Sequence, residues 1–205
     1  MPNHTPRHEY DRRPTLVDLG IFAVTLLVAD GLWKLCVSGD ESGSEVTLLG
    51  WDITALFEWM SLHIAATVYT LIHWSRDTIQ LIEGYILRFD SGTTTSVVWS
   101  CTPVKQAFIW LMLIVTTLGG WKHKSWVIPV GWILIYGINI VRITVLSLLI
   151  EFHPEWFHLL HDYVFKYIFY GLMFLMWWTF VRWFAESALG QAKSLEPRVN
   201  GAHSE

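Results

Sequence analysis

Residues 126–150 have the sequence WVIPVGWILIYGINIVRITVLSLLI, and this stretch decides the class of fold. It is longer than the ~20 apolar residues needed to cross a bilayer, and it carries one charge, Arg142. The whole chain of 205 residues is 53% hydrophobic and contains 13 tryptophans. Indole rings favour the membrane interface because they combine an apolar body with one N–H donor. The sequence therefore predicts an integral membrane protein.

Three further apolar segments resemble this one, so we expect an all-α membrane protein with about four transmembrane helices. The predicted spans are residues 15–37, 104–119, 126–150 and 163–184. Residues 54–76 are also apolar but contain Glu58, His63 and His73, and we assign them to an outer interfacial helix. Residues 83–100 predict an extracytoplasmic β-hairpin, because two β-rich runs flank an Asp-Ser-Gly turn. Together, residues 15–184 form one membrane-embedded domain between two tails, 1–14 and 185–205.

Basic residues predict the orientation, since Lys and Arg accumulate on the cytoplasmic side. They gather near the N-terminus, in one short turn and near the C-terminus: Arg7, Arg12, Arg13; Lys122, Lys124; and Arg182, Lys193, Arg198. The segment 151–161 has no Lys or Arg and is expected outside. Both termini are then cytoplasmic, in a multi-pass protein of the cell (inner) membrane. A fifth crossing at residues 54–74 would turn one basic loop to the wrong side.

Composition argues against several other classes of protein. The net charge is −4 and no basic face indicates nucleic acid. Two cysteines make a disulfide framework unfavourable. The N-terminal region lacks a cleavage site, so its apolar run is expected to remain as an anchor. No cofactor is indicated.

Cys101 lies where a polar segment turns into an apolar one, in the sequence Ser-Cys-Thr-Pro. Thr102 is a good N-cap and Pro103 suits the first helical position, so Cys101 is predicted at the positive end of a helix. That position favours a thiolate, as does Lys105 four residues later. The alternative is an inert or lipidated juxtamembrane thiol.

Arg142 is the second candidate, because a charge at such depth costs ~2.5–3.5 kcal/mol even on a lenient insertion scale. Asn139 stands three residues earlier on the same helix face and can orient Arg142 or the site that it serves. The alternative is a structural arginine paired with an acid such as Asp30.

Histidines follow in residues 151–161, with His158 and His161 three residues apart. Both are candidate bases, and His161 is favoured because it precedes the last span. A metal site with Asp162 is possible in principle, but a neighbouring thiol and arginine fit metal binding poorly, so no metal is predicted. Cys101 as nucleophile, a histidine as acid and base, and Arg142 as oxyanion stabiliser together match acyl-transfer chemistry.

The cysteine before one span, the Asn139-x-x-Arg142 pair in the next and His161 before the last resemble the exosortase/archaeosortase family. The resemblance covers residues 61–183 and is greatest to short four-span forms. It implies a membrane cysteine transpeptidase acting at the outer surface. Such enzymes cleave a C-terminal sorting signal of an exported protein and pass the protein to a lipid or other amine acceptor. Many members have glycine two residues after the cysteine, where this chain has Pro103.

Two other functions stay open at the level of sequence. One is a non-catalytic membrane component of an exopolysaccharide assembly or export system. The other is a small transporter or proton relay that uses Asp18, Asp30 and Arg142.

Overall fold

The computed structural model describes residues 16–39, 45–75, 77, 79–117 and 121–199, and it is mostly helical. The predicted tail 1–14 lies outside the described residues. The helices are α1 (Leu16–Cys36), α2 (Thr54–Ser75), α3 (Val104–Thr116), α4 (Trp121–Phe152), α5 (Phe157–Leu159) and α6 (Phe165–Val199). Two 3₁₀ turns, η1 (Trp99–Cys101) and η2 (Pro154–Trp156), and a π-helical segment, η3 (Leu160–Val164), connect them.

Among the described residues, three helices are long and apolar enough to cross a membrane: Asp18–Cys36, Thr54–Ser75 and His123–Phe152. Two of them match predicted spans. The third, α2, was assigned to the interface, yet it has the length and composition of a span. Conversely, α3 has 13 residues and a rise of ~20 Å, which is shorter than a hydrocarbon core of ~30 Å. The four-span arrangement therefore stays a prediction.

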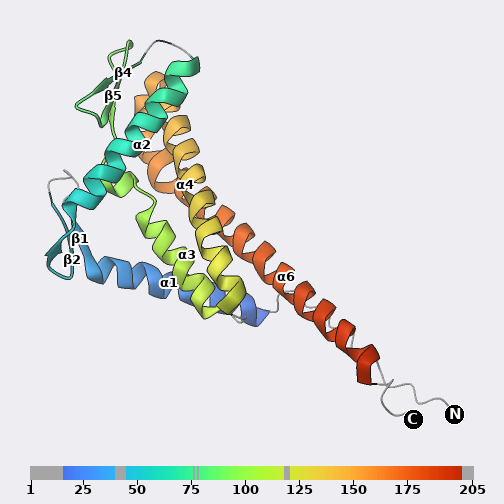
Figure 1. Ribbon diagram of the computed structural model, residues 1–205. Helices are drawn as coiled ribbons and strands as arrows, with labels where there is room; N and C mark the ends of the chain where they lie inside the picture. The colour runs from blue at the N-terminus through green and yellow to red at the C-terminus, as the bar shows by residue number, and fades with distance from the viewer. Residues whose placement is uncertain (1–15, 40–44, 76, 78, 118–120, 200–205) are drawn as a thin grey trace.

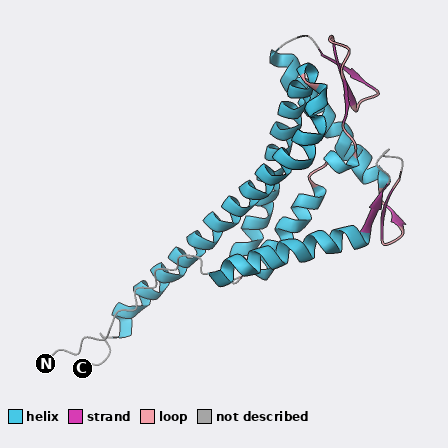
Figure 2. Ribbon diagram, turned by 180° about the vertical axis from the view of Figure 1, so that it is seen from behind, coloured by secondary structure: helices cyan, strands magenta, loops and turns pink. Residues whose placement is uncertain are grey.

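Two small antiparallel sheets accompany the helices. The first consists of β1 (Val37–Gly39), β2 (Val46–Leu48) and β3 (Trp51–Asp52), and the second of β4 (Ile79–Ile82), β5 (Ile86–Phe89) and β6 (Thr94–Ser96). Helix α2 runs from the first sheet to the second (Figure 1). Figure 2 shows both sheets in magenta on the same side of the molecule.

The second sheet contains the predicted hairpin and extends it. Strands β5 and β6 pair with Leu87 opposite Thr95, and the turn between them contains the expected Asp-Ser-Gly sequence. Gly92 has φ +89°, a conformation that favours glycine, and its N–H donates to the Phe89 carbonyl at 2.9 Å. Strand β4 adds a third strand that the sequence did not predict. The second strand of the predicted hairpin ends at Ser96 and not at residue 100, because residues 99–101 form a 3₁₀ turn.

Aromatic and aliphatic side chains of α1, α3, α4 and α6 form the largest buried cluster. Trp110 of α3 lies at its centre, 2% exposed, and its indole Nε1 donates to the Val127 carbonyl of α4 at 3.3 Å. Gly131 of α4 faces this ring, because a Cβ there would lie 2.0 Å from Trp110 Nε1. The contact places α4, the helix that carries Arg142, directly against α3.

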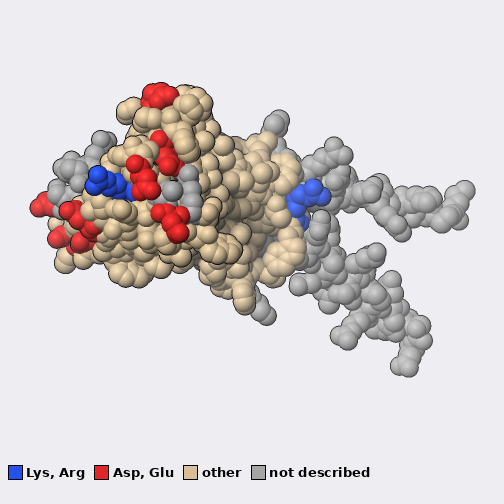
Figure 3. All heavy atoms as spheres, turned by 90° about the horizontal axis from the view of Figure 1, so that it is seen from above, with Lys and Arg blue, Asp and Glu red and all other residues tan. Residues whose placement is uncertain are grey.

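The last helix is longer than predicted. We expected a span at 163–184 followed by a tail, but α6 continues without interruption to Val199. It lies near α4 at the end that carries the second sheet and diverges from it toward the other end (Figure 1). Acidic side chains gather at the sheet-bearing end when the molecule is seen from above (Figure 3).

Lys124 has a structural role in addition to its predicted marking of a cytoplasmic turn. Its side chain is buried, and its Nζ donates to the Val115 carbonyl in the last turn of α3 at 2.9 Å. The ammonium also lies 5.1 Å from the centroid of the Trp121 ring. A cation at a helix C-terminus satisfies carbonyls that lack intrahelical partners and interacts favourably with the helix dipole.

Replacing Lys124 with methionine is expected to lower the free energy of unfolding by about 1.5–3 kcal/mol, because it removes a buried charged hydrogen bond. The matched control is Lys34→Met, because the Lys34 side chain is largely exposed and its ion pair with Asp30 should contribute far less. Equilibrium unfolding in detergent micelles measures both. Equal effects of the two substitutions would contradict the capping role.

Candidate functional site

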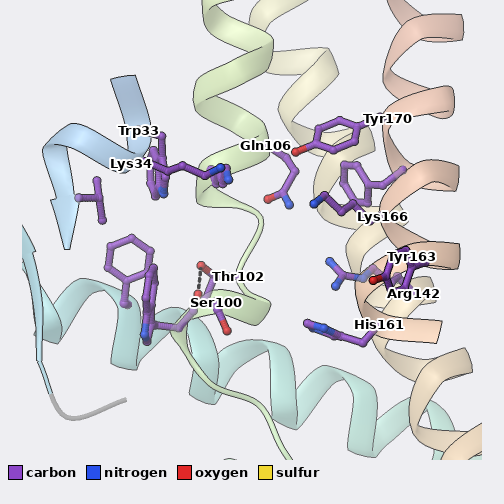
Figure 4. Close-up of a pocket in the computed structure, with 15 residues that line it drawn as sticks. Trp33, Lys34, Ser100, Thr102, Gln106, Arg142, His161, Tyr163, Lys166 and Tyr170 are labelled. Carbon is purple, nitrogen blue, oxygen red and sulfur yellow. Dashed lines mark hydrogen bonds between the residues drawn. The ribbon is translucent and has the colours of Figure 1, made fainter. Parts of the chain in front are cut away.

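A cavity of about 600 Å³ lies where α1, α2, α3, α4 and α6 approach one another. Its wall combines cations, tyrosines and aromatic residues: Trp33, Lys34, Val37, Phe57, Trp99, Ser100, Thr102, Lys105, Gln106, Arg142, His161, Tyr163, Lys166, Phe169 and Tyr170. Arg142, His161 and Lys166 project into it from one side (Figure 4). Ser100 and Thr102 lie across from them. Two of the three predicted catalytic residues therefore share one cavity, beside the segment that contains the third.

The Cys101 side chain itself is not part of this wall. It belongs to the 3₁₀ turn η1 and packs against an apolar cluster that includes Val97, Ile140 and Ile143. Helix α3 begins at Val104 with Pro103 in the N-cap position, so the predicted cap at Thr102 is wrong by one residue. Thr102 Oγ1 instead donates to the Trp99 carbonyl at 2.7 Å, which closes the 3₁₀ turn. Cys101 precedes α3, but it belongs to the separate 3₁₀ turn η1 and not to the start of that helix.

The environment of the thiol also differs from the prediction. Burial raises the pKa of Cys101, whereas backbone hydrogen bonding at Val98 and the charge of Arg142 act in the opposite direction. The predicted helix-terminus stabilisation of a thiolate is therefore outweighed by desolvation. The charge of Arg142 lowers the pKa of Cys101, so the two groups lie close enough to interact.

Asn139 connects the cysteine segment to the arginine helix. Its side chain is fully buried, and its Nδ2 donates to the Cys101 carbonyl at 2.8 Å. Asn139 and Arg142 are three residues apart on α4, so they share a face of that helix. The amide therefore fixes the position of the Cys101 backbone relative to Arg142. The expectation that Asn139 orients the site agrees with this geometry.

Lys105 is occupied by an ion pair. Its Nζ lies 2.6 Å from Asp30 Oδ1, and Asp30 Oδ2 lies 2.8 Å from Lys34 Nζ. One carboxylate of α1 thus holds two lysines at the cavity wall, and this pairing joins α1 to α3. Asp30 is not the partner of Arg142, which has no ion pair with a carboxylate among the described side chains. The structural role considered for Arg142 therefore lacks its expected partner.

The two histidines are separated by the fold. His161 lies in the π-helical segment, lines the cavity and stacks on Phe157 with ring centroids 5.2 Å apart. His158 contacts the edge of the same ring at 5.7 Å but does not line the cavity. The structure therefore places His161, rather than His158, on the same side as Arg142. No three His, Cys, Asp or Glu side chains of the described part gather as metal ligands.

The wall also contains polar residues that were not predicted from the sequence, namely Gln106, Lys166 and Tyr170. Lys166 carried a usable signal, because an ionisable residue inside a predicted span marks a functional position by default. Gln106 and Tyr170 are common at helix surfaces and gave no comparable signal.

The pKa shift of Cys101 predicts the pH profile of its reactivity. In a Cys36→Ala background, which leaves one thiol, alkylation by iodoacetamide should accelerate with pH and reach its midpoint above the usual cysteine range. Arg142→Gln should slow alkylation at pH values below that midpoint, because it removes a charge that favours the thiolate. Arg182→Gln, a substitution of an exposed residue, serves as the control. A midpoint at or below the usual cysteine range would contradict the burial effect.

Comparison with known proteins adds no relative: no family model, no curated protein and no solved structure matches this chain.

Proposed function

We propose that this chain is a membrane cysteine transpeptidase of the exosortase/archaeosortase type. The observation that carries the proposal is the connection from Cys101 through Asn139 to Arg142, beside a cavity that His161 also lines. A fixed cation and an acid–base group then line one space that can hold a substrate, and the nucleophile lies beside it. The residues of this arrangement come from three separate helical segments.

The proposed reaction begins when the Cys101 thiol turns from the apolar cluster toward the cavity. His161 accepts the thiol proton, and the thiolate attacks a peptide carbonyl. Arg142 stabilises the negative charge that develops on the carbonyl oxygen. The C–N bond then breaks, His161 gives the proton to the leaving amine, and a thioester to Cys101 remains. An amine acceptor or water attacks the thioester and releases the thiolate.

The substrate of this reaction would be an exported protein with a C-terminal sorting signal, which consists of a short motif, an apolar helix and a basic cluster. The proposal includes cytoplasmic termini, an inner-membrane location and a site that faces outside. Loop charges support this orientation. The acidic character of the sheet-bearing end is compatible with it (Figure 3).

The decisive experiment follows the mass of candidate substrates. Exported proteins from the same genome that end in such a signal are co-expressed with the native chain, Cys101→Ala or Cys101→Ser. The native chain should shorten the substrate at its C-terminus, and both variants should leave it intact. His161→Ala should allow little acylation, and hydroxylamine should release any thioester that forms. Processing that persists with a stably expressed Cys101→Ala chain would eliminate the enzyme proposal.

One observation favours a non-catalytic membrane component of an exopolysaccharide assembly or export system. The Cys101 thiol packs into an apolar cluster and does not face the cavity at rest. A purely structural thiol requires only this packing. In that case Cys101→Ala and Cys101→Ser should retain polysaccharide export, and neither should affect the length of any exported protein.

A further inference from the structure

An apolar groove continues from the cationic cavity along the surface between α4 and α6. It has a volume of about 400 Å³ and is lined by Ile133, Leu134, Gly137, Ile138, Val141, Arg142, Phe165, Ile168, Phe169 and Leu172. Arg142 and Phe169 also line the cavity, so the polar and apolar spaces meet at these two residues. From Ile133 to Arg142 the helix rises ~14 Å, which is close to one leaflet of a hydrocarbon core of ~30 Å.

The described side chains leave a net positive charge at the cavity end of this groove. Asp30 pairs with both Lys34 and Lys105 and so offsets one of their two charges. Among the described side chains, Arg142 and Lys166 have no carboxylate partner, and Arg142 Nε is buried with no hydrogen-bond partner. Both project from the same wall of the cavity (Figure 4). Guanidinium and ammonium groups in this arrangement suit phosphate oxygens.

Gly137 gives the groove its depth. It lies on α4 facing the groove, and a Cβ at this position would meet no heavy atom within 4 Å. The space beside it is therefore open in the protein itself. Gly131, on the same helix, is different because the Trp110 ring fills the corresponding space.

We propose that the cavity and groove together bind one anionic membrane lipid, with its phosphate between Arg142 and Lys166 and one acyl chain along Gly137. A charged recess joined to an apolar groove of one-leaflet depth matches the shape and charge of such a molecule. An apolar protein helix would fill the groove but would bring no anion to Arg142 and Lys166. Inorganic phosphate would satisfy the cations but would not use the groove. Binding requires neither the Cys101 thiol nor His161, so it does not depend on the proposed reaction.

The test measures binding of phosphatidylglycerol and phosphatidylcholine to the purified full chain in detergent by native mass spectrometry. The native protein should prefer phosphatidylglycerol. Lys166→Gln should weaken phosphatidylglycerol binding by about tenfold and remove this preference. Gly137→Phe should weaken it by a similar factor, because the aromatic ring occupies the path of the chain. Repeating the titration with Cys101→Ala separates this proposal from the proposed reaction, and lipid binding should be unchanged.

Two matched controls accompany these variants. Arg182→Gln removes an exposed cation of α6 that lines neither the cavity nor the groove. Gly171→Phe adds the same ring at an open glycine of α6 that does not line the groove. Both should bind phosphatidylglycerol within twofold of the native chain. Circular dichroism of all variants verifies the fold.

Four results would overturn the proposal. Equal binding of the two lipids would show that the cations do not select an anionic headgroup. Normal phosphatidylglycerol binding by a folded Gly137→Phe chain would show that the acyl chain does not lie in the groove. If a photoreactive apolar peptide crosslinks to Val141 only when Gly137 is intact, the groove binds a protein helix instead. Displacement of the lipid by millimolar inorganic phosphate would show that the site binds an anion and that the acyl chain does not contribute to binding.

Discussion

Replacing Gly131 with alanine should lower the free energy of unfolding by about 3 kcal/mol, which is a large effect for one methyl group. The added Cβ would lie 2.0 Å from Trp110 Nε1 and 2.2 Å from Cε2. The ring is 2% exposed and held in the main buried cluster, so any movement of it breaks packing contacts. Either α4 must move away from α3 or the indole must break its hydrogen bond to Val127. Equilibrium unfolding in micelles measures the loss.

The same substitution should reverse its sign when Trp110 is replaced with leucine. Without the ring there is no clash, and alanine then gains ~1 kcal/mol over glycine in a helix interior. Gly137→Ala, at an open position of the same helix, should behave in this way in the native background. If Gly131→Ala is equally destabilising with and without Trp110, the contact between these two residues is not its cause.

Replacing Asn139 with leucine should reduce substrate processing by about 100-fold while changing the free energy of unfolding by less than ~2 kcal/mol. The leucine side chain keeps the volume but cannot hold the Cys101 carbonyl, and displacement of a nucleophile by about 1 Å costs a factor of this size. The stability loss is limited because Asn139 Oδ1 is already a buried acceptor without a partner, and leucine removes it.

Ser147→Ala is the matched control for Asn139→Leu. Ser147 is also fully buried on α4, and its hydroxyl has no hydrogen-bond partner. Removing it should leave processing unchanged and stability equal or slightly higher. Asn139 acts as a positioning residue, so the rate of Cys101 alkylation should change in Asn139→Leu as well. Unaltered processing and alkylation in Asn139→Leu would refute that role.

Sequence periodicity and length were sufficient to locate the helices, because long apolar runs admit few other structures in lipid. The Asp-Ser-Gly turn was predictable for a similar reason, since it gives Gly92 its left-handed conformation. The first sheet was not predictable, because its strands have only two or three residues and lie in an acidic segment. The α3 boundary was missed by one residue because the Thr102 hydroxyl bonds backward to Trp99.

The residue types of the candidate site were predictable from the sequence, but the direction of the Cys101 side chain was not. The sequence itself shows an arginine inside an apolar run and a cysteine at a helix boundary, and both lie at the cavity or beside it. The direction of the Cys101 thiol depends on packing against α2, the second sheet and α4, which are distant in the sequence. The pairing of Lys105 with Asp30 joins residues 75 positions apart, and no local pattern reveals it.

The π-helical segment Leu160–Val164 has a consequence for how this chain can change over generations. Its hydrogen bonds span five residues instead of four, so the segment accommodates one residue more than a regular helix would. Loss of a single codon between His161 and α6 would restore regular winding and rotate His161 by about 100° around the helix axis. The imidazole would then leave the cavity although no residue of the cavity had been substituted. A one-codon deletion in this segment would therefore be enough to remove the histidine from the cavity that Arg142 also lines.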